Sequence, residues 1–110
     1  MEIHLLTVNY FYREDGFCPF QNWLEGITDR KSKSVLDSRL IRIWSGNLGD
    51  CQSVGKGVFE LKIDFGPGFR IYFAREKKQI ILLLLGGDKS SQGRDIKEAK
   101  KYLKEYKERK

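Results

Sequence analysis

The sequence predicts a single α+β domain, residues 1–110, in which an antiparallel β-sheet is packed by helices. Two segments, 58–65 and 69–74, alternate apolar and polar side chains, as strands with one buried face do. A third segment, 80–85 (IILLLL), is apolar throughout and indicates a central strand covered on both faces. Apolar residues recur with helical spacing before and after these strands, so the predicted order is β-α-α-β-β-β-α.

The N-terminal part of the chain is predicted to form one strand and two helices. Residues 2–12 (EIHLLTVNYFY) are rich in side chains that favour strands. Residues 20–27 (FQNWLEGI) place apolar side chains at positions i, i+3, i+4 and i+7, which indicates one face of a helix. Asp29 suits the N-cap of a second helix because its carboxylate can accept from free backbone donors. Gly46 is expected to end that helix.

The segments 58–65 (VFELKIDF) and 69–74 (FRIYFA) are expected to form a hairpin, because Gly-Pro-Gly at 66–68 suits a tight turn. One face of the hairpin is apolar and should pack against helices; its residues are Phe59, Leu61, Ile63, Phe65, Phe69, Ile71 and Phe73. The opposite face presents the polar residues Glu60, Lys62, Asp64, Arg70 and Tyr72. This polar face is therefore the candidate functional surface of the sheet.

The last strand runs into Gly-Gly-Asp-Lys-Ser-Ser, residues 86–91, an order of strand, glycine turn and helix that many phosphate-binding proteins share. A P-loop requires G-x-x-x-x-G-K-[ST], and Asp88 stands where the glycine before the lysine belongs. The sequence therefore excludes a nucleoside triphosphate site. The remaining interpretation is a bend at the two glycines, with one of the two serines as the N-cap of the last helix. Lys89 then lies beside a helix N-terminus, where backbone amides favour anions.

The last helix is strongly basic. Its apolar face is marked by Ile96, Ala99, Leu103 and Tyr106, and residues 97–110 hold seven Lys or Arg against three Glu. The whole chain has a net charge of +6, which favours polyanionic partners, nucleic acid before an anionic membrane. A basic surface that serves solubility alone explains the same charge, so both interpretations stay open.

Several function classes are excluded by what the sequence lacks. The longest apolar run, 80–85, is far shorter than the roughly 20 residues of a membrane-spanning helix. The N-terminus has neither the basic region nor the cleavage site of a secretory signal. Cys18 and Cys51 lack metal-site spacing, so free thiols and an intracellular location are expected. The one histidine, His4, rules out a site with two imidazoles, and no metal or cofactor is predicted.

Lys62, Arg70 and Lys89 are basic residues that the predicted sheet would bring close together. Cleavage of an RNA phosphodiester without metal requires removal of the 2′-hydroxyl proton, neutralisation of the phosphorane and protonation of the leaving oxygen. Closely packed lysines and arginines can do all three, because like charges lower the pKa of a lysine. An ordinary sheet face balanced by ion pairs, such as Glu60 with Lys62 or Arg70 with Asp64, explains the same residues equally well.

Two long segments, GVFELKIDFGPGFRIYFA (57–74) and LLLLGGDKSSQGRDIKEAKKYL (82–103), resemble the RelE/ParE superfamily of toxins. More narrowly, they are similar to its phage-derived, HigB-like addiction module killer group. In that group a Gly-Val-x-Glu-Leu-Arg/Lys strand, a Gly-Pro-Gly-aromatic-Arg turn and a Gly-Gly-Asp-Lys-Ser/Thr-x-Gln segment follow one another in this order. The resemblance extends upstream through 23–30 (WLEGITDR) and 39–50 (RLIRIWSGNLGD), so it covers most of the chain.

The resemblance implies a RelE-like fold and a cytoplasmic toxin of a bacterial toxin–antitoxin module. It also implies a metal-independent endoribonuclease that arrests translation by cutting mRNA on the ribosome. The implied partner is a small cognate antitoxin, through which alone the chain would reach operator DNA. Lys62 matches a lysine proposed as general base, Arg70 an arginine that stabilises the phosphorane, and Lys89 a basic residue at the end of the last strand. The sequence departs from RelE itself at Glu60, where RelE has a second lysine.

The resemblance also implies a surface that holds RNA. The candidate RNA-binding residues are Arg39, Arg42, Tyr72, Lys100, Lys101 and Lys104. The aromatic residue that stacks on an mRNA base in RelE has three candidates here: Tyr72 on the sheet, and Tyr102 and Tyr106 on the last helix.

Two other functions are open on the same scaffold. Relatives of the ParE type poison DNA gyrase, which requires no acid or base. A degenerate module protein that binds only its antitoxin and operator DNA would require no catalysis either, and Glu60 in place of a lysine is consistent with it.

Overall fold

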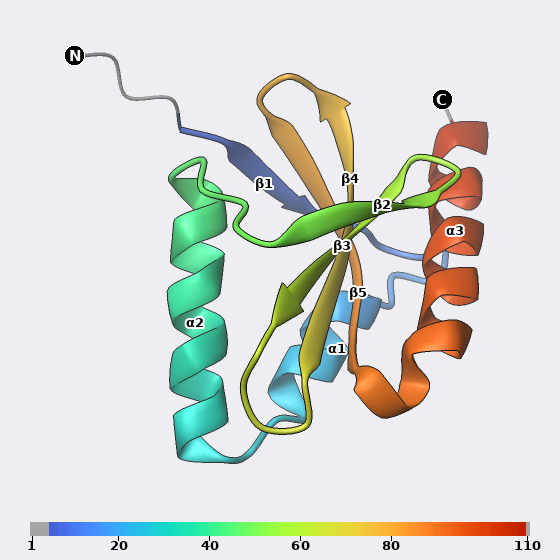
Figure 1. Ribbon diagram of the computed structural model, residues 1–110. Helices are drawn as coiled ribbons and strands as arrows, with labels where there is room; N and C mark the ends of the chain where they lie inside the picture. The colour runs from blue at the N-terminus through green and yellow to red at the C-terminus, as the bar shows by residue number, and fades with distance from the viewer. Residues whose placement is uncertain (1–4, 110) are drawn as a thin grey trace.

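The computed structural model describes residues 5–109, and in this part of the chain three α-helices pack on a five-stranded sheet (Figure 1). The predicted α+β class is confirmed. In chain order the elements are β1 (Thr7–Tyr10), α1 (Pro19–Glu25), α2 (Arg30–Trp44), β2 (Cys51–Gly55), β3 (Val58–Ile63), β4 (Phe69–Lys77), β5 (Ile80–Asp88), a 3₁₀ turn (Lys89–Ser91) and α3 (Gln92–Glu108).

The sheet is mixed, which corrects the prediction of an antiparallel sheet. Its strand order is β1-β5-β4-β3-β2, and neighbours are antiparallel except β1 and β5, which run parallel. The pairing of Thr7 with Ile80 places the N-terminal strand beside the last one. A pattern of apolar and polar residues predicts a strand but not its partner, and the long connection between β1 and β5 permits a parallel pairing.

The two edge strands depart from the prediction: β2 was not predicted, so the described residues hold one strand more than the predicted order β-α-α-β-β-β-α. Strand β2 (CQSVG) has no apolar alternation because it is an exposed edge, held by backbone pairing with β3. Strand β1 is shorter than the predicted segment 2–12 and covers Thr7–Tyr10. His4 lies outside the described residues.

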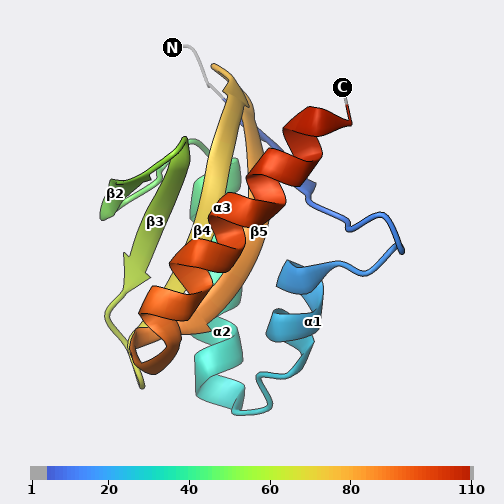
Figure 2. The ribbon, with the colours of Figure 1, turned by 90° about the vertical axis from the view of Figure 1, so that its right-hand side faces the viewer.

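Helices cover both faces of the sheet (Figure 2). α1 and α2 pack on one face, whose core is formed by Leu6, Phe20, Leu36, Ile43, Leu61, Ile63, Phe69, Ile71, Phe73, Ile81 and Leu83. α3 crosses the other face, whose core is formed by Phe11, Val58, Tyr72, Ala74, Leu82, Leu84, Ala99, Tyr102 and Leu103. The polar face predicted for the hairpin is therefore partly covered, and Glu60 and Tyr72 are fully buried there.

The start of α2 is capped as predicted. The Asp29 carboxylate accepts hydrogen bonds from the Ser32 hydroxyl at 2.7 Å and the Ser32 backbone N–H at 2.9 Å. These bonds hold the pKa of Asp29 below its usual value. After the last turn, Gly46 adopts a left-handed conformation (φ +93°), which suits glycine at a helix end.

Gly86 and Gly87 do not form the predicted bend, because β5 continues through both to Asp88. Their role is close packing on opposite faces of the sheet. A Cβ atom on Gly86 would lie 2.0 Å from the Trp23 ring of α1, and one on Gly87 would lie 1.9 Å from Asp95 Oδ2 of α3. The two glycines thus let both helices approach the backbone of β5.

The chain turns after the glycines, and the cap of this turn is Asp88 rather than a serine. Its carboxylate accepts from the Ser90 hydroxyl at 2.5 Å and from the Ser90 backbone N–H at 2.9 Å, and these bonds lower the pKa of Asp88. Ser91 occupies the N-cap position of α3, as predicted for one of the two serines, but it makes no side-chain cap bond there, and its hydroxyl donates to the Asp95 carboxylate instead. The carboxylate that excludes a P-loop therefore fixes the turn that presents Lys89.

We predict that Gly87→Ala destabilises the fold, because the added methyl group overlaps Asp95. Overpacking of this kind costs about 1–3 kcal/mol. The measurement is the free energy of unfolding in urea. Gly93→Ala is the matched control, because no atom lies within 4 Å of its added Cβ. Alanine is more favourable than glycine in a helix by about 1 kcal/mol, so this variant should not be destabilised. Equal stability of the two variants would contradict the assigned role of Gly87.

Candidate functional site

A pocket of about 620 Å³ lies where β3 ends and the β3–β4 turn begins. The three predicted catalytic residues and one predicted RNA-binding residue share it. It is lined by Val35, Arg39, Asp50, Lys62, Ile63, Asp64, Phe65, Gly68, Arg70 and Lys89. The structure thus brings Lys62, Arg70 and Lys89 together from three neighbouring strands or their ends.

The register of the strands explains why these three side chains meet. Lys62 on β3 lies directly opposite Arg70 on β4, so the two side chains share a face of the sheet. Arg70 in turn lies opposite Gly87 on β5, and Lys89 follows two residues later. The β3–β4 turn comes close to that lysine, since a Cβ on Gly68 would lie 3.5 Å from the Lys89 Cβ.

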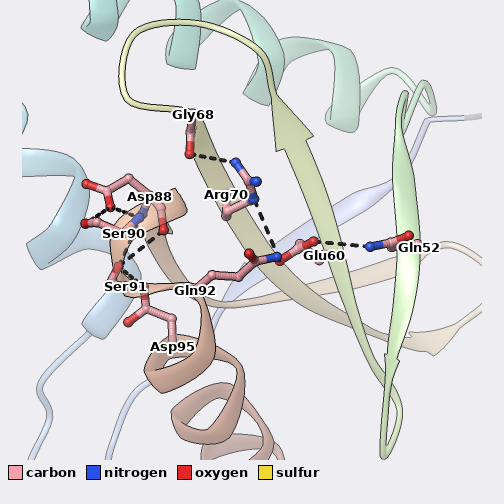
Figure 3. A network of polar contacts seen from close by, with 9 residues as sticks. All are labelled: Gln52, Glu60, Gly68, Arg70, Asp88, Ser90, Ser91, Gln92 and Asp95. Carbon is pink, nitrogen blue, oxygen red and sulfur yellow. Dashed lines mark hydrogen bonds and ion pairs between the residues drawn. The ribbon is translucent and has the colours of Figure 1, made fainter.

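Arg70 is held in place at both ends of its guanidinium (Figure 3). Its Nη1 donates to the Gly68 carbonyl at 2.7 Å, and its Nε lies 3.9 Å from Glu60 Oε2. The distance between Arg70 Nε and Glu60 Oε2 is short enough for an ion pair but too long for a hydrogen bond. Nε has no hydrogen-bond partner among the described residues, although Arg70 is only 9% exposed. A buried, oriented cation therefore forms part of the pocket wall.

Glu60 lies behind the pocket and does not line it. Its carboxylate accepts from Gln92 Nε2 of α3 at 2.8 Å and, more weakly, from Gln52 Nε2 of β2 at 3.4 Å (Figure 3). Because Glu60 is fully buried, it cannot contact a large substrate directly. It acts on the site through Arg70, whose charge it balances.

Tyr72 is the predicted site residue that the structure contradicts. It lies opposite Glu60 in the register and is fully buried beneath α3. Burial, and then the negative charge of Glu60, raises the pKa of Tyr72. The side chain therefore offers no surface to an RNA base. Sequence alternation placed it on the polar face but did not show that α3 covers that part of the face.

The pocket is positively charged on balance. Four cationic side chains, Arg39, Lys62, Arg70 and Lys89, face two carboxylates, Asp50 and Asp64. An arginine provides a planar fork of donors for phosphate oxygens, and lysine a mobile point charge. The arrangement suits a ligand with one anionic group.

The remaining predicted RNA-binding residues lie elsewhere. Lys100, Lys101 and Lys104 gather on α3 with Lys56 and Lys107 around a second pocket of about 520 Å³. Arg42 is exposed on α2 and lines neither pocket. The structure thus separates a basic surface on α3 from the cationic pocket at the end of β3.

Both tyrosines of α3 are engaged within the fold. Tyr102 is buried and its ring stacks on Phe11, with centroids 5.0 Å apart. The Tyr106 hydroxyl donates to Glu76 Oε1 at 2.6 Å. The aromatic residue that does line the cationic pocket is Phe65, which the alternating pattern assigned to the apolar face. Phe65 packs against the core on that face, as predicted, and it lines the pocket as well, because it lies beyond the end of β3 at Ile63.

Other site types find no support in residues 5–109. No group of three or more His, Cys, Asp or Glu side chains there could hold a metal ion. Cys18 and Cys51 are free, the first buried and the second half-buried. No helix in this range has the length and apolar content to cross a membrane.

Comparison with known proteins identifies a relative of this chain. A protein of Haemophilus influenzae that carries the name "Uncharacterized protein" is 43% identical over 81 residues. The matched segment covers 74% of this chain and 82% of that protein. No family model matches the sequence.

We predict that Glu60 and Arg70 stabilise the fold as a coupled pair. Glu60→Leu alone leaves a buried guanidinium without its counter-charge and should lower the free energy of unfolding by about 3–5 kcal/mol. Arg70→Met alone should have a similar cost, for the converse reason. The double variant should be more stable than the sum of the two single effects predicts. Urea unfolding of the four proteins measures the coupling, and additive effects would show that the two groups do not interact.

Proposed function

We propose that this chain, which belongs to the same family as the Haemophilus influenzae protein, is a RelE-like toxin of a type II toxin–antitoxin module. The proposed activity is ribosome-dependent cleavage of mRNA, without metal or cofactor, in the cytoplasm. One observation carries the proposal: Lys62, Arg70 and Lys89 line a single pocket that is positively charged on balance. The segments 57–74 and 82–103, which resemble the RelE/ParE superfamily, both contribute residues to this pocket.

In the proposed reaction the 2′-oxygen of a ribose attacks the adjacent phosphorus, and the bond from phosphorus to the 5′-oxygen breaks. Lys62 takes the proton of the 2′-hydroxyl as general base. Arg70 neutralises the charge that develops on the phosphorane oxygens. Lys89 gives a proton to the departing 5′-oxygen. The products are a 2′,3′-cyclic phosphate and a free 5′-hydroxyl.

The wider surface supports contact with RNA. Arg39 extends the cationic wall of the pocket, and Arg42 adds an exposed charge on the same helix. Lys100, Lys101 and Lys104 are proposed to hold RNA at the second, lysine-lined surface on α3. Phosphate contacts of this kind position a nucleic acid without reading its sequence.

The proposed partner is a cognate antitoxin, through which alone the chain reaches operator DNA. An apolar groove of about 430 Å³ between β1 and α2 supports a protein partner; it is lined by Val8, Asn9, Tyr10, Tyr12, Leu40, Ile41, Trp44 and Leu83. No charged side chain is among them, and Ile41 and Trp44 are 65% and 51% exposed. Exposed apolar residues gathered in one groove are typical of a protein interface.

We predict that Lys89→Ala lowers the rate of mRNA cleavage by about 100-fold or more, as loss of one catalytic proton donor does. Lys89 is exposed, so the variant should fold normally. Lys97→Ala removes the same charge from an exposed position on α3 outside both basic pockets, and it should cut at the wild-type rate. Primer extension on mRNA after induction in a bacterial host, with growth recorded in parallel, measures both.

Two results of that experiment would contradict mRNA cleavage, and each would support a different function. Uncut mRNA together with a DNA-damage response would support a gyrase poison. A folded wild-type protein that neither slows growth nor cuts mRNA would support a module protein that only binds its antitoxin.

We also predict that Ile41→Glu abolishes neutralisation by the antitoxin but leaves toxicity intact, because a charge enters the apolar groove. Ser34→Glu, which adds the same charge at an exposed position of α2 outside the groove, is the control and should remain neutralised. Growth is measured with the cognate antitoxin co-expressed. Full neutralisation of Ile41→Glu would exclude the groove as the contact.

A further inference from the structure

We propose that Gln92, the first residue of α3, is a positioning residue of the cationic pocket. Its amide holds the Glu60 carboxylate in a hydrogen bond, so that Arg70 stays directed to the pocket and does not close onto Glu60. The inference rests on the proposed function, in which Arg70 neutralises the phosphorane. It deepens that function, because neither the predicted site nor the lining of the pocket contains Gln92.

Two donors lie beside one oxygen of Glu60 (Figure 3). Gln92 Nε2 donates to Glu60 Oε2 at 2.8 Å, whereas Arg70 Nε lies 3.9 Å from the same oxygen. An arginine and a carboxylate that bond directly approach to about 2.7–2.9 Å, often through two parallel hydrogen bonds. Here the uncharged amide makes the short bond instead. Gln92 thus holds the oxygen beyond hydrogen-bond reach of Arg70.

The guanidinium of Arg70 is consequently fixed on its pocket side. Nη1 donates at 2.7 Å to the carbonyl of Gly68, a residue that lines the pocket. On the side of Glu60, Nε is buried and has no hydrogen-bond partner within residues 5–109. A buried donor without a partner is unfavourable, so Nε would bond to the carboxylate if the carboxylate could move. The hydrogen bond from Gln92 opposes that movement.

Loss of the Gln92 donor would shift Arg70. Solvent does not reach Glu60, because its side chain is fully buried, and a buried carboxylate takes its hydrogen bonds from the protein. To bond to Oε2 at the usual length, Nε must close the present distance by about 1 Å. That movement draws the guanidinium away from the Gly68 carbonyl and the pocket. A displacement of about 1 Å at a catalytic group can lower a rate about 100-fold.

Gln52 provides a matched comparison on the other side of the carboxylate (Figure 3). It donates to Glu60 Oε1 at the longer distance of 3.4 Å, whereas the ion pair with Arg70 is made by Oε2. Gln52 is exposed on the edge strand β2 and does not line the pocket. The same substitution at both glutamines therefore separates control of the oxygen that faces Arg70 from a general loosening of Glu60.

The test compares Gln92→Met and Gln52→Met, which remove an amide donor and keep a side chain of similar length, in the purified full chain. The first readout is the proton NMR signal of Arg70 Nε–H in ¹⁵N-labelled protein, assigned by its absence from Arg70→Lys. A hydrogen bond to a carboxylate moves such a proton downfield. The signal should therefore move downfield in Gln92→Met and keep its wild-type position in Gln52→Met. Gln92→Ala is a second variant with the same expectation, and urea unfolding checks that each variant is folded.

The second readout is steady-state cleavage of mRNA on purified ribosomes. The kcat of Gln92→Met should fall about 100-fold. Its KM should stay unchanged, because the phosphorane charge that Arg70 neutralises exists only in the transition state. Gln52→Met should keep the wild-type kcat and KM. A role of Gln92 in folding alone would leave the Arg70 signal of the folded protein in its wild-type position.

The outcomes separate this inference from the proposed function. An Arg70 signal that stays in place in both Gln92 variants, or that moves equally in Gln52→Met, would overturn the positioning role, as would a shifted signal with unchanged kcat. If the wild-type protein cuts mRNA in these cases, the proposed function stands without it. A signal that moves only in the Gln92 variants of a protein that cuts no mRNA would support the control of Arg70 by Gln92 and reject the cleavage activity.

Discussion

The buried ion pair between Glu60 and Arg70 is the interaction on which the site depends. Removal of a carboxylate from water costs several kcal/mol, which is offset here by the guanidinium of Arg70 and the amide of Gln92. Arg70 has two tasks, because it balances Glu60 on one side and lines the pocket on the other. The glutamate also joins β2, β4 and the start of α3 through its partners. Stability of the sheet and geometry of the site therefore rest on the same few atoms.

The sequence predicted those parts of the fold that have a local cause. The alternation in β3 and β4, the apolar run of β5 and the Asp29 cap each arise from neighbouring residues, and the structure contains all of them. Pairings between distant segments have no such local cause. The parallel partner of β1 and the edge strand β2 are consequently missing from the sequence-based prediction.

As with the fold, the sequence predicted the parts of the candidate site that have a local cause and missed those that depend on distant segments. Lys62 and Arg70 share a face because alternation and the Gly-Pro-Gly turn fix their register, and Lys89 follows from the position of β5. Tyr72 obeys the same alternation, yet it is buried because α3 packs over its half of the face. Phe65 packs against the core beneath α1 and α2, as the alternation predicted, but it also lines the pocket, because it lies just beyond the end of β3. Sequence patterns thus gave the face of each strand residue, but not what covers that face.

The parallel pairing of β1 with β5 has a consequence for the order of folding. Strands β2 to β5 form a meander of sequence neighbours, whereas β1 must close a chain loop from residue 7 to residue 80. Long loops carry a larger entropic cost of closure, so the meander is expected to form before β1 docks. The groove between β1 and α2 exists only after that docking. A partner that binds in the groove would therefore recognise the finished domain and would not engage a nascent chain.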